Sequence, residues 1–243
     1  MTIWIILPWE NKYKNSILVI PRGKIKTNAA NPINTAQIPY FCRLLILDFT
    51  WYNLHMQFIF VRHGEPANCY DTDGNYRPSH NANLSENGIL QAQNAGRTIA
   101  QQYNPKHIIS SDIPRALQTA QIINEQFDTK LDIETTEKLR ELHIAEDIIG
   151  SPLDEDRKKH LLKHKAIPFN QAFEICKKII KDLKRRPFNG NVVIATHGLI
   201  MNLLKFCASH DTPDYEKYLS MMDHRPYTKE SINNFCKMFV VEL

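Results

Sequence analysis

Two histidines that each precede a glycine, together with two arginines, are the residues whose types and spacing could do chemistry. Arg62 and His63 directly follow an apolar, strand-like run, His197 follows a second such run, and Arg115 lies in the first turn of a helical pattern between them. The planar fork of an arginine offers paired hydrogen bonds to a phosphate dianion, and the N–H groups of a helix start add further donors. Nearby positive charge disfavours imidazolium, so His63 would stay neutral and nucleophilic. Gathered in one pocket, these groups would bind phosphate and let His63 attack phosphorus.

Strands and helices must bring these side chains together, and the hydrophobic pattern predicts both in alternation. Strand-like runs fall at about 57–62, 107–110, 131–135, 191–196 and 235–243, with helical patterns between them at about 86–103, 113–127, 153–164, 170–186 and 198–209. This alternation favours an α/β fold, a three-layer α/β/α sandwich with a mostly parallel central sheet. Ligands of such sheets bind beyond the carboxyl ends of the strands. Six residues fall there: Arg62, His63, Ser110, Ser111, His197 and Gly198.

Two of the helices carry start signals. Ser85 is predicted to be the N-cap of the first helix, and Asp112 to cap the second, with Pro114 in its first turn. The first helix places apolar or small residues on one face, namely Ile89, Ala92, Ala95, Gly96 and Ile99. That face is expected to pack on the sheet.

Composition and charge indicate a globular protein rather than one that binds nucleic acid. The chain has 243 residues, of which 43% are hydrophobic and 23% charged. Residues 1–55 hold six Lys or Arg against two acids, which accounts for the formal charge of +4 and leaves 24 of each sign in 56–243. A surface that follows nucleic-acid phosphates usually shows a basic excess. Two basic runs, 157–165 and 177–186, lie on helical patterns where solvated charge is normal, and an anionic substrate or partner is the alternative interpretation.

Cysteine usage and hydropathy indicate the cellular compartment in which the protein is expected. Five widely spaced cysteines without a C-x-x-C pair indicate neither a disulfide framework nor a zinc site, and they fit a reducing cytoplasm. No apolar run reaches the roughly 18 residues that span a bilayer, and the first residues lack the basic region of a signal peptide. We therefore expect a cytoplasmic protein that is not inserted in a membrane. Nothing in the sequence indicates an oligomeric state.

Residues 1–55 differ in texture from the rest and are expected to form an irregular N-terminal extension to a catalytic domain at 56–243. Their short apolar patches are separated by polar stretches, with no sustained helical or strand period. Two interpretations are open. The favoured one is upstream sequence included by a misplaced start, and the other is a tail that anchors or regulates the domain.

Four blocks of the sequence resemble those of the histidine phosphatase superfamily, also called phosphoglycerate mutase-like. In the order typical of that family they are FVRHGEP (60–66), LSENGILQAQNAG (84–96), SSDIPRALQTAQII (110–123) and VVIATHGLI (192–200), with LREL (139–142) at the place of its acidic residue. Together they span most of residues 56–243. The resemblance implies the phosphoglycerate mutase-like form of the α/β/α sandwich.

The resemblance also implies roles for individual residues. His63 would be the nucleophile that becomes phosphohistidine. Arg62, Arg115 and His197 would hold the phosphoryl oxygens. Each role also has a physical ground, because phosphoryl transfer spreads negative charge over three equatorial oxygens, and preplaced cations and donors lower its barrier without a metal ion. No metal ligands and no cofactor are therefore predicted.

The resemblance suggests two further site residues, Glu141 and Asn68, from their positions relative to the matching blocks. Glu141 matches the family's proton donor, and a single carboxylate can protonate the leaving oxygen and later activate water. Three other acids are near enough in sequence to compete with it: Glu65, Glu146 and Asp147. Many mutase-like relatives have a phosphate-binding asparagine where this chain has Cys69, with Asn68 one position earlier as a candidate for the same contact.

These residues together predict a metal-independent phosphomonoesterase that hydrolyses a small phosphorylated metabolite through a phosphohistidine on His63. Only 55 residues separate Glu141 from His197, whereas phosphoglycerate mutases carry a longer insertion that covers the site, so water would reach the phosphohistidine here. The alternatives are a cofactor-dependent phosphoglycerate mutase and a non-catalytic phosphate-binding protein on the same fold. The loops at 66–83 and 143–170 are expected to set specificity.

Overall fold

The computed structural model describes residues 3–6, 17–20, 56–70, 72, 79, 81–222 and 225–242, and the chain divides into two units, Met1–Asp48 and Phe49–Leu243. In the first unit, β1 (Ile3–Ile6) pairs with β2 (Ile17–Ile20) in antiparallel fashion. Two apolar patches of the expected irregular extension are therefore strands. Each strand has four residues, which is too short for a period to be recognised in sequence. A third apolar patch of the extension, RLLILDF (43–49), lies outside the described residues.

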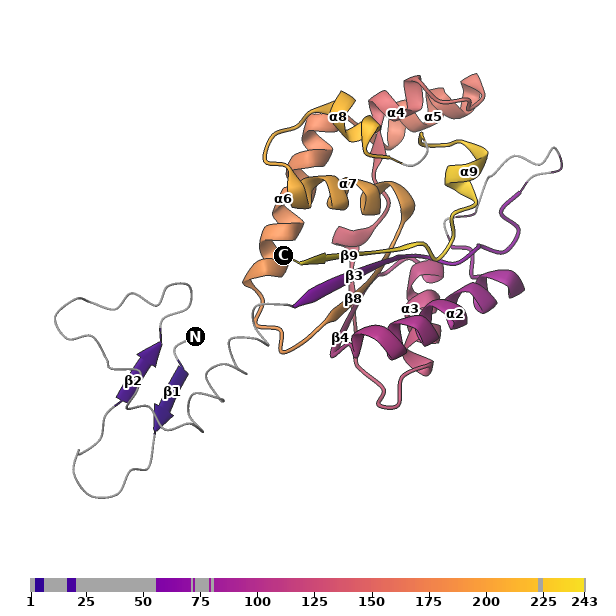
Figure 1. Ribbon diagram of the computed structural model, residues 1–243. Coiled ribbons are helices and arrows are strands. Elements are labelled where there is room, and N and C mark those ends of the chain that lie inside the picture. Colours follow the sequence, from indigo (N-terminus) through magenta and orange to yellow (C-terminus); the bar gives the residue numbers. More distant parts are fainter. Residues whose placement is uncertain are drawn as a thin grey trace, which may run out of the picture. The chain divides into compact units, whose positions relative to one another are not determined.

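The described part of the second unit is built on a five-stranded sheet (Figure 1). Its strands, in spatial order, are β5 (Ile133–Thr136), β4 (His107–Ser111), β8 (Val192–Thr196), β3 (Gln57–Arg62) and β9 (Met238–Glu242). The first four are parallel to one another, and β9 runs antiparallel to β3 at the edge. The expected mostly parallel sheet is confirmed.

Helices cover both faces of this sheet, which makes the three layers visible in Figure 1. One layer is formed by α2 (Glu86–Tyr103) and α3 (Pro114–Glu125), the other by α6 (Phe169–Arg185) and α7 (Gly198–Ser209). Side chains of a strand alternate between faces, so β3 serves both cores: Phe58 and Phe60 pack with α6 and α7, while Ile59 and Val61 pack with α2 and α3. The α/β/α sandwich is confirmed.

A segment of short elements lies between β5 and α6, beginning with the 3-10 turn η2 (Glu137–Leu139). It contains β6 (His143–Ile144), α4 (Ala145–Ile149), α5 (Glu155–His164) and β7 (Ala166–Ile167), and β6 pairs with β7 in parallel. We call residues 143–167 the cap. After α7 follow α8 (Tyr215–Ser220) and α9 (Lys229–Ile232). The hydroxyl of Tyr215 donates to Asp147 at 2.8 Å, which ties α8 to the cap.

The two predicted helix caps have opposite outcomes. Ser85 is the N-cap of α2, and its hydroxyl accepts from the N–H of Gly88 at 3.0 Å. The prediction for Asp112 is wrong, because α3 begins after Ile113 without a side-chain cap. The carboxylate of Asp112 instead accepts from Nε of Arg140 at 2.8 Å, and a charge-assisted pair of this kind is stronger than a neutral capping bond.

The described part of the chain has neither a membrane-spanning helix nor a cluster of metal ligands. No helix among those residues is long and apolar enough to cross a bilayer. Nor does that part of the chain bring together three or more His, Cys, Asp or Glu side chains that could hold a metal ion.

Candidate active site

The register between β3 and β8 brings the two histidines together. Arg62 lies opposite Thr196, and the N–H of His63 donates to the Thr196 carbonyl at 2.9 Å. The next residue along β8 is His197, whose ring centroid is 5.2 Å from that of His63. Because the strands are parallel, both histidines leave the sheet at the same edge, as expected for a site at the carboxyl ends of the strands.

His63 is held as a neutral imidazole with one defined tautomer. Its Nδ1 is 2.7 Å from the carbonyl oxygen of Gly64, which can only accept, so Nδ1 carries the proton. Its Nε2 accepts from Nε of Arg115 at 3.1 Å. Burial lowers the pKa of His63 well below its usual value, and the charges of His197, Arg115 and Arg62 lower it further. The lone pair of Nε2 is therefore available on the side of the arginines.

Two glycines make the backbone around His63 rigid. A Cβ atom on Gly64 would lie 2.5 Å from the carbonyl oxygen of Gly88, so the loop after β3 and the first turn of α2 touch backbone to backbone. The N–H of Gly64 donates to the hydroxyl of Thr119 at 3.0 Å, and that hydroxyl donates to the Arg115 carbonyl at 2.7 Å. The nucleophile and Arg115 are thereby linked through one side chain of α3.

Arg62 lies in a buried slot formed by the C-terminal part of the chain. Its Nη1 donates to the Ser231 carbonyl at 2.6 Å, and its guanidinium carbon lies 4.7 Å from the ring centroid of Phe235. A Cβ atom on Gly198 would lie 3.2 Å from Nε of Arg62, so glycine at this position leaves room for the guanidinium. Stacking on an aromatic ring and a carbonyl bond fix its plane.

His197 is fully buried at the end of β8. Its Nε2 is 2.9 Å from the hydroxyl oxygen of Ser111, the last residue of β4. The neighbouring strand therefore orients this ring. Ser111 was expected among the residues at the strand ends, and it acts here on the ring of His197.

Glu141 is held at the N-terminus of α7. Its Oε1 accepts from the N–H groups of Leu199 at 3.1 Å and Ile200 at 3.0 Å. The segment before it is fixed by the Thr196 hydroxyl, which donates to the Leu139 carbonyl at 2.8 Å. Burial raises the pKa of Glu141 above its ordinary value, and the two N–H groups and the arginines counter this only in part. A carboxyl group of this kind can carry a proton to donate.

The three competing acids are engaged elsewhere. Glu65 accepts from the Ser85 hydroxyl at 2.7 Å, Glu146 accepts from the N–H of Phe169 at 3.0 Å, and Asp147 accepts from Tyr215. Among the described residues, Glu141 is the acidic residue that lines the pocket next to His63.

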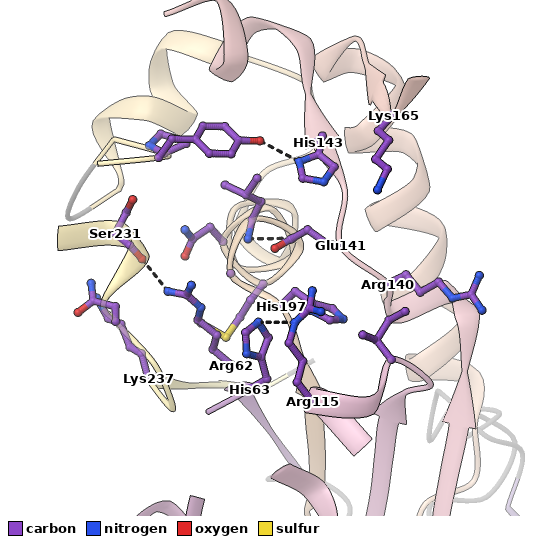
Figure 2. Close-up of a pocket in the computed structure, with 18 of the residues that line it drawn as sticks. Arg62, His63, Arg115, Arg140, Glu141, His143, Lys165, His197, Ser231 and Lys237 are labelled. Carbon is purple, nitrogen blue, oxygen red and sulfur yellow. Dashed lines mark hydrogen bonds between the residues drawn. The ribbon is translucent and has the colours of Figure 1, made fainter. Parts of the chain in front are cut away.

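One pocket of about 480 Å³ collects these groups, as Figure 2 shows. Its floor, a name we use for Arg62, His63, Arg115 and His197, lies below Glu141. Its walls include cap residues and C-terminal residues, among them His143, Arg157, Lys165, Tyr227 and Lys237. Asn68 does not line it, but is exposed in a turn at a positive φ of 50°.

Six residues were assigned a role from the sequence, and the pocket collects all of them except Asn68: Arg62, His63, Arg115, Glu141 and His197. Other residues that carried no motif help to hold them. Ser231 belongs to a stretch without a recognisable pattern, while Phe235 opens the strand-like run 235–243 and precedes β9; both hold Arg62. Thr119 lies four residues after Arg115, on the same helical face, and that spacing could have identified it. The helix start that donates its N–H groups in the pocket is that of α7, and it holds Glu141.

Comparisons with known proteins give one family and several relatives. The family model of the histidine phosphatase superfamily (branch 1) matches residues 58–222. Phosphoglycerate mutase-like protein 4 of Arabidopsis thaliana is 25% identical over 180 residues, which cover 68% of this chain and 76% of that protein. The crystal structure of phosphoserine phosphatase from Entamoeba histolytica in complex with 3-phosphoglyceric acid has a TM-score of 0.50 at 22% identity, covering 69% of this chain and 85% of that one.

A structure of phosphoglycerate mutase from Bacillus anthracis has a TM-score of 0.47 at 20% identity, with 63% of this chain and 80% of that chain covered. At 22% identity and a TM-score of 0.50, the phosphoserine phosphatase structure bears on the fold alone, while the family model bears on the ancestry of the sequence.

Proposed function

The chain belongs to the histidine phosphatase superfamily (branch 1), and on this premise we propose that it is a metal-independent phosphomonoesterase that hydrolyses a small phosphorylated metabolite through a phosphohistidine on His63. In this proposal Arg62, Arg115 and His197 bind the phosphoryl oxygens, and Glu141 is the proton donor and acceptor. The positive charge of the two guanidiniums offsets the charge that develops on the phosphoryl group.

The orientation of His63 is the observation that carries the proposal. The Gly64 carbonyl accepts the proton of Nδ1, so the lone pair of Nε2 points to the side of Arg115. Burial and three cationic or ionisable neighbours hold its pKa far below neutral pH, so the ring is unprotonated under ordinary conditions. A neutral imidazole in a cationic pocket is suited to attack a bound dianion.

The first step forms the phosphohistidine. Nε2 of His63 attacks phosphorus, and the bond between phosphorus and the ester oxygen breaks. Glu141 gives its proton to that oxygen, so an alcohol leaves rather than an alkoxide. Arg115 donates to the same Nε2, and substrate binding must therefore turn this donor towards a phosphoryl oxygen before the attack.

The second step returns the site to its starting form. The Glu141 carboxylate accepts a proton from water while the water oxygen attacks phosphorus, and the bond between phosphorus and Nε2 breaks. Inorganic phosphate leaves, and His63 regains its lone pair. The proton stays on Nδ1 in both steps and remains hydrogen-bonded to the Gly64 carbonyl, so the ring keeps its orientation.

The rival mutase reaction differs only in the acceptor of the phosphoryl group. The segment between Glu141 and His197 has 55 residues and includes the cap, and the Arabidopsis relative carries a mutase-like name. We favour hydrolysis because a short segment over the pocket admits water to the phosphohistidine. A non-catalytic phosphate-binding protein would have no need of a neutral histidine facing the anion.

The experiment follows p-nitrophenyl phosphate with the full chain and two variants. We expect the wild type to release inorganic phosphate and to carry a base-stable phosphoryl group on His63 after rapid quenching. His63→Ala should lose turnover to background, while His164→Ala, an exposed histidine of α5 outside the pocket, should keep it. Full turnover in folded His63→Ala protein would refute the proposed nucleophile.

Two further assays test metal independence and distinguish the phosphatase from the mutase. Turnover should survive prior treatment with EDTA, because no step needs a metal ion, and a loss that added metal restores would contradict metal independence. Incubation with 3-phosphoglycerate and a catalytic amount of 2,3-bisphosphoglycerate should release inorganic phosphate. Conversion to 2-phosphoglycerate without phosphate release would establish the mutase instead.

A further inference from the structure

The pocket carries more positive charge than one phosphoryl group requires. Six arginines and lysines line it: Arg62, Arg115, Arg140, Arg157, Lys165 and Lys237. Among the described residues on its wall, Glu141 is the acidic one. Two of the six cations belong to the floor and face the phosphoryl site. The other four lie outside the floor.

Two of the outer cations differ from Arg140 in having no partner within the described chain. Arg140 is paired with Asp112 at 2.8 Å and lies 3.4 Å from Glu137, so its charge is already offset. The side chains of Arg157 and Lys165 make no hydrogen bond or ion pair with any other residue that the structure describes. Arg157 is half-buried and Lys165 exposed, and a cation that lines a cavity without an acid paired to it is ready to accept an anionic group.

These two cations are placed by the fold of the cap. They stand at the two ends of α5, where Arg157 is in the first turn and Lys165 directly follows the last residue of the helix. Leu161, between them, is 2% exposed and holds α5 in place. The pairing of His143 with Ala166 puts Lys165 next to the strand that lines the pocket, and Figure 2 shows its side chain beside His143.

His143 completes this outer part of the pocket as a neutral group. Its Nδ1 is 2.9 Å from the hydroxyl oxygen of Tyr227. Burial lowers the pKa of His143 to about 4, and the charges of Lys165, Arg157 and Arg115 add to that effect. Lys165 and Arg157 from the cap and Arg115 from the floor therefore all lie near enough to His143 to influence it. An anion placed there would meet two full positive charges and a polar ring.

We propose that Arg157 and Lys165 form a second anion-binding site in this pocket, which selects phosphomonoesters that carry another anionic group, a carboxylate or a second phosphate. The inference rests on the proposed function, because the floor must hold the phosphoryl group that is hydrolysed. A volume of about 480 Å³ leaves room for a metabolite beyond the phosphoryl group itself. Recognition of both anions at once fixes the orientation of the substrate.

The rest of the basic run 157–165 supplies the contrast. Lys158 pairs with Glu155 at 3.2 Å. Lys159 and Lys163 are exposed and do not line the pocket. The cations of this run are therefore divided: those at its two ends line the cavity, and the interpretation as a solvated face holds for Lys159 and Lys163.

The test compares two substrates that differ in the second anionic group alone. The full chain is assayed with 3-phosphoglycerate and glycerol 3-phosphate, and kcat/KM for the first should exceed that for the second by about 10-fold or more. In Arg157→Gln/Lys165→Gln this ratio should fall towards one. The matched control Lys159→Gln/Lys163→Gln removes the same charge from the same helix and should keep the wild-type ratio.

A second pair, fructose 1,6-bisphosphate against fructose 6-phosphate, tells a second phosphate from a carboxylate. A ratio near one for both pairs in the wild type, or a preference that the Arg157→Gln/Lys165→Gln variant retains, would overturn the second site. A preference lost equally in the control variant would also overturn it, because general charge would then explain it.

Binding to His63→Ala protein keeps this result separate from that for hydrolysis. Calorimetry should give about 10-fold tighter binding of 3-phosphoglycerate than of glycerol 3-phosphate without any turnover. If the wild type hydrolyses no phosphomonoester while this preference is present, the proposed function fails and the second site stands. If the wild type turns over phosphomonoesters but the two compounds bind equally well to His63→Ala protein, the second site fails and the proposed function stands.

Discussion

The floor and the cap face the same pocket but are built differently. The four floor residues are between 0 and 9% exposed, and hydrogen bonds with the loop after β3 and with β4, β8, α3 and α9 fix them. In the cap, Arg157 is half-buried and Lys165 is exposed, and neither side chain has a fixed partner in the described chain. Chemistry that needs sub-ångström placement lies where strand register sets positions, and selection of substrates is left to side chains that can adjust.

Removing a floor cation should give the largest effect after loss of the nucleophile. Arg115→Ala is expected to lower kcat/KM for p-nitrophenyl phosphate by about 10²–10³, because a preplaced donor to the phosphoryl oxygens is lost. Arg97→Ala, on the exposed face of α2, is the control and should change it less than two-fold. Steady-state assays at matched thermal stability measure both. An effect of Arg115→Ala below about three-fold would mean that the floor does not bind the phosphoryl group.

Glu141 lies between floor and cap, and its variant should have an effect that depends on the leaving group. Glu141→Gln is expected to lower kcat/KM for alkyl phosphates by about 10–10² and for p-nitrophenyl phosphate much less, because kcat/KM reports the step that forms the phosphohistidine and nitrophenolate leaves in it without protonation. Glutamine can still accept from the N–H groups of Leu199 and Ile200, so the segment should stay in place. Comparable losses for both classes of ester would show that Glu141 is not the proton donor.

The smallest effect on turnover is expected in the cap, at Asp147, where the readout is stability. Burial raises the pKa of Asp147 to about 7, against the hydrogen bond from Tyr215. In the unfolded chain its pKa is about 3.9. Between these values the folded chain binds more protons, so this residue lowers stability as pH rises from about 4 to 7.

Asp147→Asn removes this titration while keeping an oxygen that can accept from Tyr215. Relative to the wild type, the variant should gain free energy of unfolding as pH rises, with a slope of at most about 1.4 kcal/mol per pH unit. Urea unfolding at several pH values measures the difference. A difference that is flat between pH 4 and 7 would mean that the buried carboxyl is not protonated.

Sequence reasoning succeeded where local pattern and parallel topology act together. Arg62, His63 and His197 end two buried strands, and parallel strands bring such ends to one edge. It failed for Asp112, where a local cap was expected and a partner 28 residues away took the carboxylate. It could not separate Arg157 and Lys165 from Lys159 and Lys163, since all four are cations in one basic run.

The amino-acid sequence by itself determined the α/β/α architecture, the strand ends that carry the histidines, and the family, because these depend on short-range periodicity and on motif order. The tertiary structure alone decided which acid lines the pocket with His63, which tautomer the ring adopts, and which two cations of the run 157–165 face the cavity. Those outcomes depend on contacts between residues far apart in the chain, such as the Thr196 bond to Leu139 and the packing of Leu161, and no local pattern encodes them.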